Sequence, residues 1–152
     1  MDSSEQVLSV TAAAWAPSMA PEEYGAFLNT LLEAERAGAK LLSAYLNELT
    51  PGSFMWKAIR EVQLDESRNC STLVHLLLEA EVTPTSAVGS FYGRGLAMRD
   101  WRERLQFLNR GQAWVARRLA AALPRVPESA RRALQAMLDS HVANIGSCEA
   151  LL

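Results

Sequence analysis

LNTLLEAERAGAKLL, residues 28–42, is the stretch that decides the fold. Its apolar residues recur every three or four positions, so Leu28, Leu31 and Leu42 share one face of a helix. Glu35 interrupts that face at its middle. Because burying an isolated charge costs on the order of several kcal/mol, we expect Glu35 to be paired with another group, bound to a metal or protonated.

The same periodicity predicts three more long helices. Short turns at residues 50–53 and 124–127 contain proline, and each joins two helices into an antiparallel pair. No segment shows the strict alternation that is typical of a β-strand. We therefore predict an all-α fold, a four-helix bundle with helices over residues 21–49, 54–81, 97–123 and 128–152.

Two segments fall outside these four helices. Residues 1–20 are predicted to be an N-terminal extension with a short helix over residues 5–15, and residues 21–152 form the bundle domain. Residues 82–96 are the longest connection, which fully extended reaches the length of a long helix. We expect a crossover there between the second and third long helices, with Phe91 and Tyr92 closing an end of the bundle. Its glycines follow no strand and match no phosphate-binding motif.

Composition indicates an ordinary soluble protein. The 152 residues suit one domain with a core, and 49% are hydrophobic and 21% charged. No run approaches the roughly 18 apolar residues of a membrane span, and the N-terminus lacks the basic region of a signal peptide. Cys70 and Cys148 form no CxxC motif, so we expect free thiols, a cytoplasmic location and no membrane partner.

Charge is divided unevenly along the chain. Residues 1–81 hold five Lys/Arg and twelve Asp/Glu, whereas residues 82–152 hold ten Arg and five Asp/Glu. Two oppositely charged halves attract each other within one fold. Because the arginines form only short pairs and no recognition motif accompanies them, we predict no nucleic-acid partner.

Each predicted helix carries a polar residue near the middle of its apolar face: Glu35, Glu66, Gln112 and His141. Each of these residues lies eleven to fourteen positions from the predicted turn that joins its helix to its pair. Antiparallel helices with short turns bring such equidistant residues to the same level. We therefore predict that the four side chains meet in one buried layer, with Asn69 on the same face as Glu66.

Four other titratable side chains do not reach this layer. His75 is predicted to point outward, because nine residues from Glu66 is half a turn round the helix. Asp65 can only flank the layer, and Glu33 and Asp139 are expected to be solvated. With no GxSxG motif and no second histidine nearby, we predict no hydrolase triad.

The polar residues resemble a known ligand pattern. Ferritin-like di-iron bundles carry Glu on one helix and Glu-x-x-His on the next, and repeat this in the second helix pair. This chain has Glu35 with Glu66-Ser67-Arg68-Asn69, then Gln112 with Leu138-Asp139-Ser140-His141. It therefore resembles a ferritin or rubrerythrin bundle in which Asn69 replaces a histidine, and Gln112 and Leu138 each replace a glutamate. The chain is also similar to a bacterial group of ferritin-like domains without established activity, in the segments LLEAERAGAKLL, VQLDESRNC and FLNRGQAWVARRL.

This resemblance covers about residues 21–152 and leaves Glu35, Glu66 and His141 as candidate metal ligands. They could hold a single Fe, Mn or Zn ion, with Gln112 or Asn69 as a further ligand or as a hydrogen-bond partner of the ligands. A di-iron centre normally needs more carboxylates. The alternative is a metal-free layer in which His141 bridges the carboxylates and the amides satisfy the remaining oxygens.

Two functions follow from these alternatives. The first is a non-catalytic or vestigial ferritin-like bundle that acts as an interaction or dimerisation module, with the polar layer in place of a di-iron site. The second is a metal-dependent oxidoreductase or metal-binding protein that uses a reduced ligand set with Fe or Mn. The missing ligands favour the first. Four aromatic residues offer more aromatic surface than one narrow helix face can hide: Trp56, Trp101, Phe107 and Trp114. They favour a homodimer through a helix face, with packing inside the monomer as the alternative.

Overall fold

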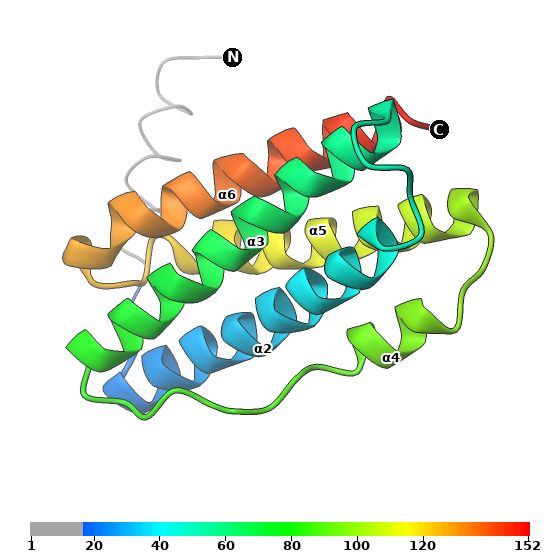
Figure 1. Ribbon diagram of the computed structural model, residues 1–152. Coiled ribbons are helices and arrows are strands. Elements are labelled where there is room, and N and C mark those ends of the chain that lie inside the picture. Colours follow the sequence, from blue (N-terminus) through cyan, green and yellow to red (C-terminus); the bar gives the residue numbers. More distant parts are fainter. Residues whose placement is uncertain (1–16) are drawn as a thin grey trace, which may run out of the picture.

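Four long helices lie side by side in the computed structural model, which describes residues 17–152 (Figure 1). A fifth, short helix lies in the connection between the second and third long helices. No strand forms within the described residues, which confirms the all-α class. The predicted helix over residues 5–15 lies outside them. The helices are α2 (Pro21–Leu46), α3 (Phe54–Glu79), α4 (Phe91–Leu96), α5 (Trp101–Ala122) and α6 (Glu128–Glu149).

Local capping residues set where the helices begin. Pro21 opens α2, where its missing N–H costs nothing because the first turn has no carbonyl to receive it. The Ser53 hydroxyl accepts a hydrogen bond from the Trp56 amide at 3.3 Å and caps α3. The Asp100 carboxylate caps α5 by accepting from the Glu103 amide at 3.0 Å. The prediction that this helix starts at residue 97 was wrong, because Asp100 has an extended backbone.

The C-terminus of α3 closes with a Schellman motif. The Val82 amide donates to the Leu77 carbonyl at 2.9 Å, and the Glu81 amide donates to the Leu78 carbonyl at 3.1 Å. Glu81 has a φ of 58°, in the left-handed region that glycine normally occupies at this position. The helix therefore ends slightly before the predicted residue 81.

The segment between α3 and α4, here called the crossover, runs back along α2 (Figure 1). Arg36 on α2 donates to the carbonyls of Thr85 and Ala87, both at 2.8 Å. The Thr85 hydroxyl donates to the Glu33 carboxylate at 2.9 Å. The prediction that Glu33 is solvated was therefore wrong, because its helix face is covered by the crossover.

The crossover ends in α4, which packs against α2 and α5. Phe91 at its start stacks on Phe107 of α5 with a centroid distance of 4.2 Å. Tyr92 lies near the Lys40 ammonium of α2. These rings therefore cover the side of the helices. The prediction that they close an end of the bundle was wrong.

Two apolar clusters form the core. The residues predicted on the inner faces of α2, α3 and α5 are almost all buried. On α6 Met137 and Asn144 are buried, whereas the apolar neighbours Leu138 and Ile145 are only half-buried. One cluster surrounds Leu28 and Leu134, and the other surrounds Leu42 and Leu105. The polar residues fall between the two clusters in all four long helices.

A buried arginine, which the sequence analysis missed, joins the start of α5 to α2. Arg104 is 3% exposed, and its guanidinium is 2.7 Å from the Glu48 carboxylate. It also donates to the Met98 carbonyl at 3.0 Å and lies over the rings of Tyr45 and Trp101, at 4.5 and 4.6 Å. These contacts satisfy a charge that would otherwise be costly to bury.

None of the helices formed by residues 17–152 combines the length and the hydropathy that a bilayer crossing requires.

Candidate functional site

The four polar residues predicted to share one layer do meet inside the protein. Glu35 comes from α2, Glu66 from α3, Gln112 from α5 and His141 from α6. None of these side chains is more than 6% exposed. Counting positions from the turns was therefore sufficient to find the layer, because short turns hold each helix pair in register.

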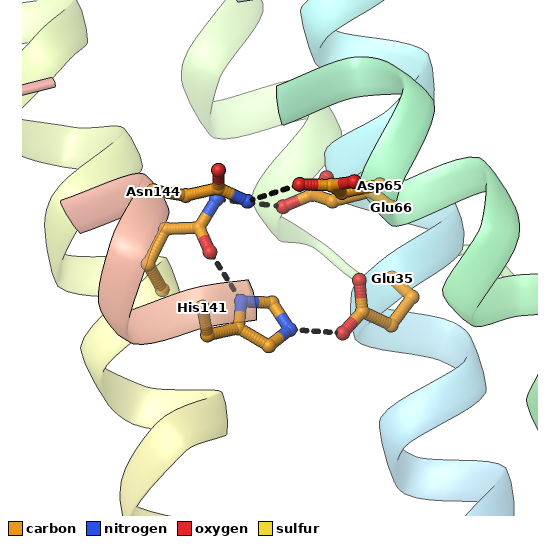
Figure 2. A network of polar contacts seen from close by, with 6 residues as sticks. Glu35, Asp65, Glu66, His141 and Asn144 are labelled. Atoms are coloured by element: carbon orange, nitrogen blue, oxygen red, sulfur yellow. Dashed lines mark hydrogen bonds and ion pairs between the residues drawn. The ribbon is translucent and has the colours of Figure 1, made fainter. Parts of the chain in front are cut away.

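These four side chains form a continuous chain of polar contacts. The Gln112 amide nitrogen donates to Glu66 Oε1 at 3.0 Å. The Gln112 oxygen contacts His141 Nδ1, and His141 Nε2 contacts Glu35 Oε1. Figure 2 shows His141 pointing from α6 towards Glu35 on α2. Every one of the four long helices is thus linked to another through this layer.

The direction of the Gln112 amide assigns the protons around His141. Since the amide nitrogen donates to Glu66, the amide oxygen must accept, and His141 Nδ1 therefore carries a proton. The other ring nitrogen, Nε2, faces Glu35 Oε1, so His141 joins the Gln112 amide to the Glu35 carboxylate.

Burial raises the pKa of Glu66 well above its usual range. The negative charges of Glu35 and then Asp65 raise this pKa further, whereas the hydrogen bond from Gln112 lowers it. The folded protein therefore keeps the proton on Glu66 to a higher pH than the unfolded chain does.

Gly38 provides the space for the Glu66 carboxyl group. A Cβ atom at Gly38 would lie 2.0 Å from Glu66 Oε2 and 2.7 Å from its carboxyl carbon. Only glycine therefore permits this side chain to occupy its present position. Among residues 17–152, Glu66 Oε2 and Glu35 Oε2 are buried without a hydrogen-bond partner.

A second, smaller set of polar contacts flanks the layer, also visible in Figure 2. Asn144 of α6 is 6% exposed and donates to Asp65 at 3.2 Å. Arg68 approaches the same carboxylate at 3.0 Å. Asp65 therefore flanks the layer as predicted. Asn144 was missed, although its position three residues after His141 places it on the same helix face.

The other sequence candidates take no part in the hydrogen bonds of the layer. Asn69 is buried on the same face of α3 as Glu66, but its amide nitrogen has no partner among the described residues. His75 points outward, as predicted, and pairs with Glu79 on the surface. Cys70 and Cys148 are free thiols, as expected. Burial is the main cause that raises the pKa of Cys70 to about 12 and that of Cys148 to about 11, so neither is a reactive thiolate.

The donor atoms of this layer do not fit a metal ion in their present arrangement. Both ring nitrogens of His141 are engaged, by Gln112 and by Glu35. Glu66 connects to the histidine only through the neutral Gln112 amide. Within residues 17–152, no three His, Cys, Asp or Glu side chains are grouped so that they could hold a metal. A metal bound by Glu35, Glu66 and His141 would require these side chains to rearrange.

Comparison with protein families gave one informative match. Residues 22–150 match the domain of unknown function DUF6306. The chain belongs to the DUF6306 family. No curated protein and no solved structure matched it. The DUF6306 match includes all four residues of the layer and the whole crossover, so the site described above is part of the family domain.

Proposed function

We propose that this DUF6306 protein is a non-catalytic, cytoplasmic ferritin-like four-helix bundle in which a buried hydrogen-bonded layer replaces the di-iron centre. The observation that supports this proposal best is the place of Gln112. It lies between His141 and Glu66 and hydrogen-bonds to both. At this position the ferritin-like pattern has a carboxylate, whose negative charge attracts a metal cation. The neutral Gln112 amide lacks that charge.

Such a layer has a structural use. Each of its members has a specific partner on another helix, so a helix that slides or turns would leave buried polar atoms unsatisfied. This penalty falls on compact but wrong arrangements and not on the unfolded chain, because water satisfies the same atoms there. The layer therefore specifies which helix faces which, at some expense in stability compared with an apolar core.

Elemental analysis tests the metal-free state. The protein is purified without chelator from cells supplied with iron and manganese, and its metal content is measured by mass spectrometry. We expect no stoichiometric metal, and none after anaerobic addition of Fe(II). Stoichiometric metal that is lost in both Glu35→Ala and His141→Ala would overturn the proposal.

Restoring the absent ligands tests the ferritin-like layout itself. The variant with Asn69→His, Gln112→Glu and Leu138→Glu recreates the two-fold ligand pattern that the resemblance implies. If the layout is correct, this variant gains iron or manganese binding while keeping its helical circular dichroism spectrum. The surface variant Gln135→Glu, also on α6, is the control and gains none. A folded triple variant without metal affinity would refute the layout.

As an interaction module, the bundle is proposed to pair with a second copy through a helix face. Large apolar side chains on its surface support this, with Phe54 78%, Leu78 61% and Val142 58% exposed. Phe107 gives no support, since it is 2% exposed and stacked inside the protein. Light scattering during gel filtration measures the mass, and we expect a dimer that Leu78→Glu or Val142→Glu dissociates. A monomer at all concentrations would contradict this pairing.

A further inference from the structure

A cleft of about 520 Å³ opens between α2, the end of the crossover and α5. Its volume falls within the range of about 300–1,000 Å³ that is usual for small-molecule sites. Glu35, Glu66 and Gln112 line its inner end, so the cleft connects the buried layer with the surface. Nothing in the proposed structural role of the layer requires this opening.

The inner end of the cleft carries two carboxyl oxygens that have no hydrogen-bond partner. Glu35 is 1% exposed and Glu66 is 6% exposed, and Oε2 of each has no partner within residues 17–152. Buried carboxyl oxygens are rarely left unsatisfied, because each loses its bonds to water. An amine or a hydroxyl on a bound molecule, which can donate and accept hydrogen bonds, would satisfy them.

The walls of the cleft are apolar and aromatic. Phe91 from α4 stacks on Phe107 from α5, and both line the cleft together with Val115 and Trp114. Gly111 allows Phe91 to approach α5, because a Cβ atom at Gly111 would lie 2.7 Å from that ring. A flat or aliphatic body would therefore replace water along these walls at a gain in free energy.

Three arginines surround the outer end. Arg94, Arg110 and Arg117 all line the cleft and are exposed. Among residues 17–152, no carboxylate lies within 4.0 Å of any of these three guanidinium groups. Arg94 and Arg110 rest against the Phe107 ring, at 5.3 and 5.8 Å from its centre. Exposed guanidinium groups that line one cleft attract an anionic group, and a single guanidinium can bind it with two parallel hydrogen bonds.

We propose that this cleft binds a small organic acid with an apolar body, whose acidic group meets the three arginines and whose opposite end hydrogen-bonds to Glu35 and Glu66. The acidic group is a carboxylate, sulfonate or phosphate, and the opposite end carries an amine or a hydroxyl. The inference goes beyond the structural role proposed for the layer, because it assigns a ligand to the DUF6306 domain.

Three matched naphthalene probes test each part of the proposal by isothermal titration calorimetry. The first is an aminonaphthalenesulfonate with its two groups on opposite rings; the others lack either the amino group or the sulfonate. We expect the first probe to bind most tightly, and loss of either group to weaken binding about tenfold. Equal affinities of the three probes, or no binding by any of them, would overturn the proposal.

Variants then locate the binding site. Replacing Arg94, Arg110 and Arg117 together by Gln should weaken the sulfonate probes about tenfold and leave the probe without sulfonate unchanged. The pair Arg131→Gln and Arg132→Gln, on the surface of α6, is the matched control and should change neither. Unchanged sulfonate affinity in the triple variant would refute the role of the arginines.

A blocked cleft gives a second, independent test. Thr30 lines the cleft from α2 and is half-buried, so Thr30→Phe should place a ring in the cleft and weaken binding of all three probes about tenfold. Its circular dichroism spectrum checks that the variant is folded. Full binding by a folded Thr30→Phe protein would place the ligand elsewhere and overturn the proposal. Because the probes contain no metal, these results are independent of the elemental analysis.

Discussion

Replacing Glu66 by glutamine should make the protein more stable at neutral and alkaline pH. The substituted amide keeps the shape of the carboxyl group and still accepts the hydrogen bond from Gln112. It cannot ionise, however. In the natural protein burial raises the pKa of Glu66, so ionising it costs more in the folded state than in the unfolded chain.

The size of the effect follows from linkage. Between the pKa of the unfolded chain, near 4.5, and the higher pKa of the folded protein, the folded state binds more protons at Glu66 than the unfolded state does. Stability is therefore greatest below this window and falls as pH rises through it, by up to about 1.4 kcal/mol per pH unit. Glu66→Gln removes this slope, so its advantage over the natural protein grows with pH and is constant above the window.

Urea unfolding followed by circular dichroism measures this, at pH values from about 4.5 to about 8. Glu61→Gln, the same chemical change at an exposed position of α3, is the control and should keep the natural slope. If the stability curves of Glu66→Gln and the natural protein run parallel across this range, then Glu66 titrates alike in the folded and unfolded states. Burial of the Glu66 carboxyl group would then have no measurable effect on its ionisation.

Three further substitutions have expected outcomes that the same unfolding assay measures. Gly38→Ala should destabilise the protein by about 1–3 kcal/mol, because the new methyl group displaces the Glu66 carboxyl group. This loss of stability should vanish in a Glu66→Ala background, and a loss that persists there would contradict the cause. Glu81→Gly should stabilise by about 1 kcal/mol, since it relieves the left-handed backbone after α3, and a lower midpoint would contradict that strain. Arg104→Ala should cost about 2–3 kcal/mol through its lost ion pair and ring contacts, whereas exposed Arg102→Ala should change little; equal effects would refute the role of burial.

The helices and the buried layer were predictable because they depend on local information. Helical periodicity places Glu35 and Glu66 on apolar faces, and short turns bring them to the same depth. The rotation of α6 about its own axis, which decides which of its residues are buried, was harder to predict. Both Leu138 and Ile145 are apolar and both lie at helical spacing from His141, so periodicity alone could not show that Asn144 is the buried neighbour.

The course of the crossover was predictable only in outline. Its length indicated a long connection, but the short helix α4 within it went unpredicted. Glu33 also looked solvated, because a helix face with charges normally meets water. Glu33 accepts a hydrogen bond from Thr85, which lies 52 residues further along the chain, and Arg36 on α2 donates to the Thr85 carbonyl. No local pattern reveals such distant partners.

The sequence by itself determined the all-helical class, the four long helices and the depth at which Glu35, Glu66, Gln112 and His141 meet. These properties follow from residue spacing along single helices and from the lengths of two turns. Only the tertiary structure decided which atoms of the layer bond to one another, because this depends on side-chain torsions and on the space that Gly38 leaves open. It also decided that the layer has an opening to the surface, because α4 and the crossover come to lie beside α2 and α5 through packing between distant segments.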